Sequence, residues 1–533
     1  MPTAEILFKN GNLWCPENST AGATALAVGQ KRIMAIGQDT ELVDLTGDQT
    51  RVVDLGGRLL TPGLWDSHIH LYHWSRARKH LQLENCSGKE EVLERLRAAP
   101  GNLEWVVGWH LNCSRWKEPE LPTRYDLDSV CSDRPVLLWL SDLHSAVVNT
   151  SALELAGLTA HNPMIAGGVV EVDVHGKPTG ILRELAANLV REQLPEPSWP
   201  LLKSLLKEGL LELSRFGITS LNDQRIKDLD DGAIVFRALR DLESAGELNV
   251  RVNCNVAAHH LDQAAALGLS TGFGTDFLRV GHLKVFSDGT LGSKTARMLQ
   301  PLVGEEQTGL YLTPPQEMEE VFRRAAEMGF AVSVHSIGDE SCRVCLNIFE
   351  RMQKDGVAST SVPHRVEHAQ IVADRDVARF AELGLTVSAQ PGHLLDDRFI
   401  ADPLLGSRAH TAYRFRDLER AGALLAWGTD APVSTVDPRY GLQGAVHRAL
   451  VGDQPWFGEQ ALSFQSALRG YTLGPAQATG RECEVGSLRV GSSADLVVWS
   501  KGFEKAANFL DHEVELTVSG GRIVYQCSHS ESA

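Results

Sequence analysis

The segment Leu60-Thr-Pro-Gly-Leu-Trp-Asp-Ser-His-Ile-His70 decides the fold, because an apolar, strand-like run ends there in two histidines. Residues two apart on a strand point to the same side, so His68 and His70 share one face. Two imidazoles placed in this way can bind one metal ion at about 2.0–2.1 Å each. A lone His-x-His pair also arises by chance, so its meaning depends on the rest of the chain.

Further apolar runs follow the first one, separated by helix-like stretches such as residues 315–328, 373–383 and 415–421. Repeated strand–helix units indicate a parallel sheet, and eight of them indicate a closed (β/α)₈ TIM barrel of the α/β class. Besides the first, the candidate strands are residues 216–223, 248–254, 278–286, 330–335, 364–368, 385–389 and 424–430.

Both ends of the chain contain short apolar runs broken by Gly and Asn, which are typical of hairpins. Neither end can bury a core alone, so residues 1–58 and 480–527 are expected to pair into one composite β-sandwich. The barrel is expected to take residues 59–75 and 210–479. Residues 76–209 are too many for one loop and predict an inserted α+β subdomain at the barrel mouth.

Composition excludes several classes of function. The chain has 533 residues, of which 68 are acidic and 51 basic, giving a net charge of −17. Such a surface repels nucleic acid and acidic membranes. No apolar run is long enough for a membrane span, the N-terminus does not resemble a secretory signal, and the nine cysteines are scattered. We therefore expect reduced thiols, a cytoplasmic location, a small-molecule substrate and, as for many oligomers, a homodimer.

Other candidate strands also end in residues that bind metals. His335 follows Val332-Ser-Val, His368 follows Arg365-Val-Glu, and Asp430 follows Ala426-Trp-Gly-Thr. A buried polar group at such a place is costly unless it is paired or coordinates a metal. One of them alone is best explained as a satisfied core group, but four histidines and an aspartate at four strand ends favour a metal site at the C-terminal face of the barrel.

Lys284, in His282-Leu-Lys-Val-Phe-Ser-Asp288, lies near the end of the fourth candidate strand. Desolvation normally excludes lysine from a barrel interior. A salt-bridged or snorkelling lysine is one explanation. The other is an amine that captures CO₂ and becomes a carbamate, a long carboxylate able to bridge two metals.

The ordered set of His68, His70, Lys284, His335, His368 and Asp430, with β pieces at both termini, resembles the amidohydrolase superfamily. The phrases Lys284-Val-Phe-Ser-Asp-Gly-Thr-Leu-Gly-Ser, His335-Ser-Ile-Gly-Asp339 and Arg365-Val-Glu-His-Ala-Gln370 resemble its amidohydrolase-3, YtcJ-like branch, which includes N-substituted formamide deformylases. The resemblance runs from about residue 5 to residue 525.

The resemblance implies metal-dependent hydrolysis. His68, His70 and Asp430 would hold one metal, His335 and His368 a second, and Lys284 would bridge them. Two cations lower the pKa of a shared water, and the hydroxide attacks a carbonyl carbon while Asp430 transfers the proton to the leaving nitrogen. Zn²⁺ suits these ligands, one or two ions are possible, and Fe, Mn or Co are alternatives.

Candidate substrate-binding residues lie near the ligand pair and in the insert. Tyr72, His73 and Trp74 follow His70, and the insert offers His110, His144 and Asn149. For the insert the alternative is capping and packing. Four tryptophans could line a site for an apolar substrate group or could pack in a hydrophobic core: Trp65, Trp74, Trp109 and Trp139. For Trp139 the core is the preferred interpretation. The Cys342-Arg-Val-Cys345 pair is interpreted as helix packing.

The predicted function is cleavage of a C–N bond in a small amide, such as an N-substituted formamide. A deaminase or cyclic-amide hydrolase of the same superfamily is the first alternative, and a non-catalytic binding protein on the same scaffold is a remote one. The sequence has no phosphate-binding glycine motif, which argues against a kinase or a nicotinamide-dependent dehydrogenase.

Overall fold

Eight parallel strands form the largest sheet of the computed structural model, which describes residues 3–17, 20–101, 104–113, 116–141, 145–161, 163–165, 167–227, 231–357 and 360–528. The spatial order is β20-β19-β18-β17-β16-β15-β14-β7, as expected for a barrel built in sequence order. The predicted (β/α)₈ barrel is confirmed. Its strands are β7 (Leu64–Ile69), β14 (Ile218–Asp223), β15 (Arg251–Ala257), β16 (Leu278–Phe286), β17 (Val332–Ser336), β18 (Arg365–His368), β19 (Thr386–Ala389) and β20 (Leu424–Trp427).

The first and last strands approach each other at their C-terminal ends. The backbone N–H of Asp430 donates to the carbonyl of His68 at 2.6 Å, and the N–H of His70 donates to the carbonyl of Ala431 at 2.9 Å. These two bonds link the segments that follow β20 and β7. The ends of all eight strands therefore surround one place, where this barrel type carries its active site.

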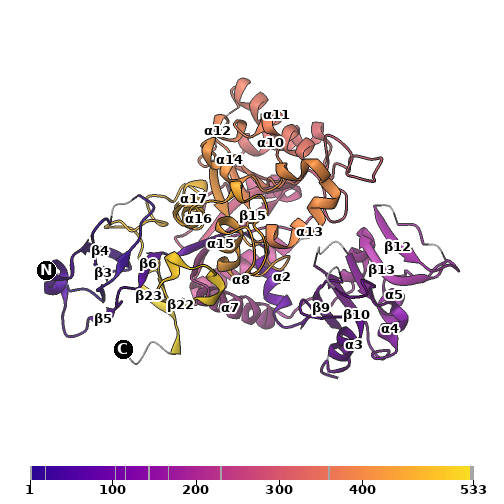
Figure 1. The fold of residues 1–533 in the computed structure, drawn as a ribbon, viewed down its shortest axis with the longest axis horizontal. Helices are drawn as coiled ribbons and strands as arrows, with labels where there is room; N and C mark the ends of the chain where they lie inside the picture. Colours follow the sequence, from indigo (N-terminus) through magenta and orange to yellow (C-terminus); the bar gives the residue numbers. More distant parts are fainter. Residues whose placement is uncertain are drawn as a thin grey trace. The chain divides into compact units, whose positions relative to one another are not determined.

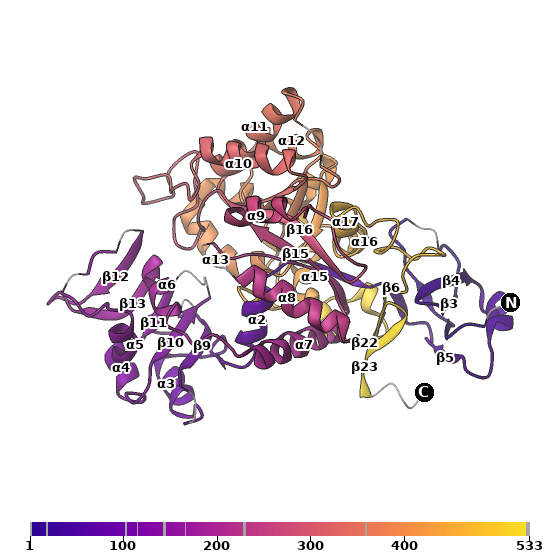
Figure 2. The ribbon, with the colours of Figure 1, turned by 180° about the vertical axis from the view of Figure 1, so that it is seen from behind.

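Helices cover the outside of the barrel, as Figures 1 and 2 show for α8, α10 and α11. In α11, Cys342, Cys345, Leu346 and Phe349 are buried at the spacing of one helix face. The Cys-x-x-Cys pair is thus packed in the helix, and all nine cysteines are free thiols. The main barrel helices are α7 (Trp199–Arg215), α8 (Asp231–Ser244), α9 (Leu261–Ala266), α10 (Pro315–Glu327), α11 (Asp339–Lys354), α12 (Arg379–Glu382), α13 (His393–Leu405), α14 (Phe415–Arg420), α15 (Pro438–Val446), α16 (Phe464–Gly470) and α17 (Leu473–Ala478).

Two predicted elements differ from the structure. The first predicted strand, residues 60–68, divides at Gly63 into β6 (Leu59–Pro62) and β7. Gly63 is required there, because a Cβ atom would lie 2.2 Å from Oγ1 of Thr219. The predicted helix 373–383 is a 3₁₀ turn, Asp374–Asp376, followed by the short α12. Within this 3₁₀ turn, the carboxylate of Asp376 forms ion pairs with Arg343 and Arg379.

Strands from both termini form a β-sandwich, so this part of the predicted fold is also confirmed. One sheet has the order β4-β3-β1-β5 and the other β2-β6-β21-β22-β23. Phe8, Leu26, Leu496 and Val518 belong to their shared core. The strands are β1 (Ile6–Lys9), β2 (Asn12–Leu13), β3 (Ala25–Gly29), β4 (Arg32–Gly37), β5 (Arg51–Asp54), β21 (Leu496–Trp499), β22 (Val514–Ser519) and β23 (Arg522–Gln526), with α1 (Asp39–Leu42) after β4.

The chain divides into two compact units. Barrel and sandwich form one, comprising Met1–Leu71, Leu206–Ala431 and Thr435–Ala533, and the other comprises Tyr72–Leu205 and Pro432–Ser434. The second unit contains a sheet of order β12-β13-β11-β10-β9-β8 with helices α3 to α6. Among the described residues, no helix is both long and apolar enough to cross a bilayer.

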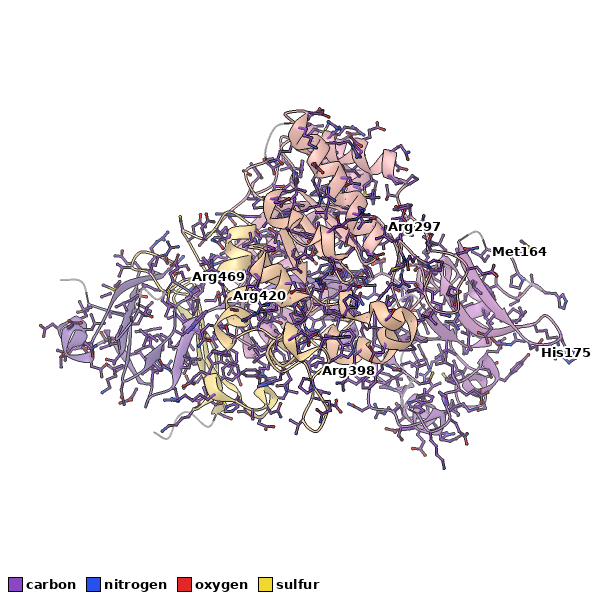
Figure 3. All side chains as sticks on the ribbon, turned by 45° about the horizontal axis from the view of Figure 1, so that its top comes forward. Met164, His175, Arg297, Arg398, Arg420 and Arg469 are labelled. Carbon is purple, nitrogen blue, oxygen red and sulfur yellow. The ribbon has the colours of Figure 1, made fainter. Side chains whose placement is uncertain are left out.

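The sheet of the second unit is buried on both faces. In β10 (Val136–Leu140), Leu137 and Trp139 enter one apolar core, whereas Val136 and Leu138 enter another. Met164 and His175, which Figure 3 labels, precede and follow β12 at the edge of this sheet. Its other elements are β8 (Leu81–Gln82), β9 (Val106–Leu111), β11 (Ser145–Val148), β12 (Gly168–Val172), β13 (Pro178–Glu184), α3 (Lys89–Arg97), α4 (Arg124–Asp128), α5 (Thr150–Leu155) and α6 (Leu185–Arg191), with α2 (Leu71–Ala77) joining it to β7.

Candidate metal centre

Three of the predicted ligands converge closely at the C-terminal end of the barrel. His68, His368 and Asp430 are all buried, and one ligand atom of each lies within 4.8 Å of the others. His70 joins them, because its Nε2 lies 3.1 Å from Oδ1 of Asp430. The His335 ring packs edge-on against His368, with ring centroids 4.5 Å apart. Strand ends that are far apart in sequence thus bring five potential ligands together.

The orientation of His68 is set by a buried carboxylate. Nδ1 of His68 donates to Oε2 of Glu367 at 2.7 Å, which leaves Nε2 directed toward Asp430 at 3.4 Å. Burial, followed by the charge of Lys284, lowers the pKa of His68 to about 4. The imidazole is therefore neutral at pH 7, as a metal ligand must be.

His368 and His335 are held by uncharged groups. Nδ1 of His368 donates to Oε1 of Gln390 at 2.8 Å, and Nε2 of His335 donates to the carbonyl of Gly289 at 3.3 Å. These bonds make Nε2 of His368 and Nδ1 of His335 the nitrogens that would face a cation. Burial, followed by the neighbouring His335, lowers the pKa of His368 well below its usual range.

Asp430 supplies the negative charge of the cluster. Burial would raise the pKa of Asp430, but His68 and His70 hold it well below its usual range. The backbone of Asp430 is left-handed, with φ of 59°, a conformation that few residues other than glycine adopt. Such strain concentrates at functional sites.

Asp66 fixes the loop that carries Asp430. Its carboxylate accepts from the backbone N–H of Thr429 at 3.0 Å and from the Thr429 hydroxyl at 2.6 Å. It also accepts from the N–H of His68 at 3.1 Å. Burial raises the pKa of Asp66 to about 7. Asp66 thus ties the segment after β20 to β7.

Lys284 is buried in β16, as predicted, with 2% of its surface exposed. Burial lowers the pKa of its ammonium group to about 8, against the opposing effects of Glu367 and Asp430. Its Nζ lies 5.0 Å from the ring centre of Phe286, which also packs on His335. An amine with this pKa is partly neutral near pH 8, which is the state that reacts with CO₂.

The residues of the cluster fit a divalent cation. Oδ1 of Asp430 is buried without a hydrogen bond of suitable geometry among the described residues, and so is Nδ1 of His70. Neutral imidazoles around an ionised carboxylate are the ligands that Zn²⁺, Fe, Mn and Co accept. A cation at this place would coordinate this buried carboxylate oxygen, which has no hydrogen bond of suitable geometry.

The predicted substrate-binding residues belong to the second compact unit. Tyr72 donates to Glu196 at 2.8 Å and accepts from Arg76 at 2.8 Å, while Trp74 lies under Arg78. His73 is also buried in α2. His110, the last but one residue of β9, has φ of 63° and bonds through Nε2 to the carbonyl of Pro432, two residues after Asp430. His144 lies outside the described residues.

Several singled-out residues have structural roles instead. Asn149 caps α5 and bonds to the backbone of Val136 and Cys131. Trp65 is buried and donates to Asn222 at 2.8 Å. Trp109 and Trp139 pack together in the core of the inserted unit. These contacts match the capping interpretation of Asn149 and the core interpretation of Trp139.

Glu367, Gln390 and Asp66 are the residues that the sequence interpretation missed. Arg365 and Glu367 occupy alternate positions of β18, so both point to the same side of that strand. Two opposite charges on the inward face of a barrel strand could have indicated a buried ion pair near the site. Gln390 had no such signal, because it follows the one ligand-free strand between β18 and β20.

The barrel and its buried His/Asp cluster define a metal-dependent hydrolase of the amidohydrolase type. The chain belongs to the amidohydrolase family, whose pattern it matches over residues 51–525. YtcJ of Bacillus subtilis (strain 168), which carries the name of an amidohydrolase, is 30% identical over 495 residues, covering 90% of this chain and 91% of YtcJ.

Two further relatives cover nearly the whole chain. An N-substituted formamide deformylase of Arthrobacter pascens is 28% identical over 514 residues, with 93% of each chain covered. The crystal structure of an uncharacterized metal-dependent hydrolase from Pyrococcus horikoshii OT3 superimposes with a TM-score of 0.78 at 26% identity, covering 95% of this chain and 99% of that one. The resemblance to the YtcJ-like branch is thereby confirmed.

Proposed function

We propose that this protein hydrolyses a C–N bond of a small amide, with N-substituted formamides as the first substrate class to test. The observation that carries the proposal is the buried convergence of His68, His368 and Asp430 within 4.8 Å. The similarity to the Arthrobacter pascens N-substituted formamide deformylase over 93% of the chain supports the bond type.

The proposed cofactor is Zn²⁺, in one or two ions. His68, His70 and Asp430 would hold one, and His335 and His368 the other. The cation supplies Lewis-acid activation of water and of the substrate carbonyl when it is bound. The protein's own contribution is to present neutral imidazoles and an ionised carboxylate in a buried place.

Asp430 is the proposed general base and acid. Its carboxylate is ionised, because His68 and His70 keep its pKa well below the usual range. It can therefore accept a proton from the attacking water at a carboxylate oxygen and donate that proton to the departing nitrogen. The left-handed backbone at Asp430 directs the carboxylate toward the two histidines, 3.1 Å from Nε2 of His70.

Lys284 is the proposed bridging ligand. Its neutral amine would attack CO₂, form an N–C bond and lose one proton, which gives an anionic carbamate. The lowered pKa of about 8 supplies the neutral amine. A carbamate would also replace a buried cation by an anion among ligands that are otherwise uncharged, apart from Asp430.

The test is a screen of the zinc-loaded protein against N-substituted formamides, other amides, lactams and aminated heterocycles. The proposal expects release of amine from an open-chain amide, loss of turnover after chelation, and recovery on zinc addition. Turnover restricted to aminated heterocycles would indicate a deaminase, and turnover restricted to lactams a cyclic-amide hydrolase. Full amide turnover after complete metal removal would contradict the proposal.

A further inference from the structure

Glu367 lies beside a predicted ligand in the sequence but bonds to a different one. It immediately precedes His368 on β18, yet its Oε2 accepts from Nδ1 of His68 on β7 at 2.7 Å. Glu367 is fully buried, and His68 is 1% exposed. The carboxylate therefore connects two strands that are separated in the sheet order by four others.

The backbone conformation at His368 allows both Glu367 and His368 to point into the barrel. Consecutive side chains of a strand alternate between its two faces, so an inward Glu367 would send His368 outward. The structure instead has left-handed φ values of 69° at His368 and 40° at Ala369. This turn brings His368 to 4.9 Å from His68 between ring centroids, although it costs conformational free energy.

A network holds the Glu367 carboxylate in place. Oε1 accepts from the Ser333 hydroxyl at 2.6 Å and from Nε of Arg365 at 2.8 Å. Arg365 is itself fully buried, and its Nη2 donates to the carbonyl of Ser67 and to the hydroxyl of Ser388, both at 2.7 Å. Both oxygens of Glu367 are thus occupied, because Oε2 accepts from His68 and also, at 3.3 Å, from Nη2 of Arg365.

We propose that Glu367 is a positioning residue that keeps the proton of His68 on Nδ1 and so presents the Nε2 lone pair to the metal. A carboxylate that accepts from a ligating imidazole fixes the ring and increases its basicity. His368 has only the neutral Gln390 in this role. The inference rests on the proposed metal-dependent function, but it concerns metal binding and is tested without substrate.

The first test is Glu367→Gln, with Glu319→Gln as the matched control. Glu319 carries the same carboxylate but pairs with Arg323 and Arg351 on the barrel helices, away from the metal centre. Zinc affinity of each metal-free protein is measured by chelator competition. We expect a loss of about 10- to 100-fold in Glu367→Gln and less than about twofold in Glu319→Gln. Equal affinities of Glu367→Gln and the wild type would overturn the proposal.

A second measurement applies to the unmodified protein if Glu367→Gln fails to fold. Long-range ¹H–¹⁵N spectra of ¹⁵N-histidine-labelled, metal-free protein report which ring nitrogen carries the proton, and a His68→Asn variant assigns the signal. We expect the proton on Nδ1 of His68. A proton on Nε2, or rapid exchange between the nitrogens, would contradict the proposal. A protein that binds zinc normally but hydrolyses no amide would contradict the proposed function and leave this inference intact.

Discussion

The backbone N–H of Asp430 donates a 2.6 Å hydrogen bond to the carbonyl of His68. The bond joins the segment after the eighth barrel strand to the first strand, and it connects two predicted ligands through the main chain. Ligand geometry and barrel closure therefore depend on the same few atoms. Gly428 allows this approach, because a Cβ there would lie 2.5 Å from both N and Cβ of His68.

Gly428→Ala is expected to disturb the closure and the cluster together. The added methyl must displace the His68 backbone, so we expect the free energy of unfolding to fall by about 1–3 kcal/mol and zinc to bind more weakly. Urea unfolding and chelator competition measure the two effects. Gly88→Ala is the control, because its Cβ meets no atom within 4 Å. A Gly428→Ala protein with wild-type stability would show that the backbones at Gly428 and His68 have room for an added methyl group.

Asp430→Asn is expected to retain the fold but lose turnover. The amide can neither accept the proton nor balance the charge of a cation, so we expect kcat to fall by about 10²–10⁴-fold. Steady-state rates and metal analysis check the result. Asp355→Asn is a suitable control, because that carboxylate is exposed and forms an ion pair with Arg323 at the protein surface. Turnover within a few-fold of the wild type would remove Asp430 from the proposed proton transfer.

Lys284→Ala tests the bridging carbamate. Loss of a preorganised charged group in an active site typically costs about 10²–10³-fold in kcat, and we expect a parallel loss of bound metal. Lys294→Ala, which removes an exposed lysine paired with Glu305, is the control. The carbamate carbon is observable by ¹³C NMR after incubation with ¹³C-bicarbonate. A wild-type protein without this signal, together with an active Lys284→Ala protein, would mean that Lys284 does not bridge.

The barrel was predictable from sequence because most of its strands are apolar runs of the right length between helices, although β18 contains Arg365 and Glu367. The ligands were found because His335, His368 and Asp430 lie at the ends of predicted strands. The break at Gly63 was not predictable, since it depends on Thr219, a residue distant in sequence. The charges of Arg365 and Glu367 were a visible signal, but the bond from His68 to Glu367 was hidden, because it joins two strands that are distant in sequence. The candidate substrate-binding residues belong to the inserted unit, whose packing no strand pattern specifies.

His364 predicts a pH dependence of stability that is separate from the metal centre. Burial lowers the pKa of His364 to about 4 from 6.5, and Nδ1 accepts from the backbone N–H of Val332 at 3.0 Å. The unfolded chain therefore binds more protons between pH 6.5 and 4. This contribution to the free energy of unfolding is present above pH 6.5 and is lost as the pH falls toward 4, by about 3 kcal/mol.

The matched variant is His364→Asn, whose amide oxygen can accept the same hydrogen bond but does not titrate. Unfolding in urea from pH 4 to pH 7 compares the two proteins. We expect the stability of the wild type to fall more steeply with acidification than that of His364→Asn. Parallel curves would show that His364 is protonated equally in the folded and unfolded chains.

Anomalous diffraction from crystals of the zinc-loaded protein, recorded at the zinc edge, tests the central claim most directly. We expect an anomalous peak that has Nε2 of His68 and a carboxylate oxygen of Asp430 at about 2.0–2.2 Å. An active, zinc-loaded protein whose anomalous peaks all lie away from these two side chains would contradict it.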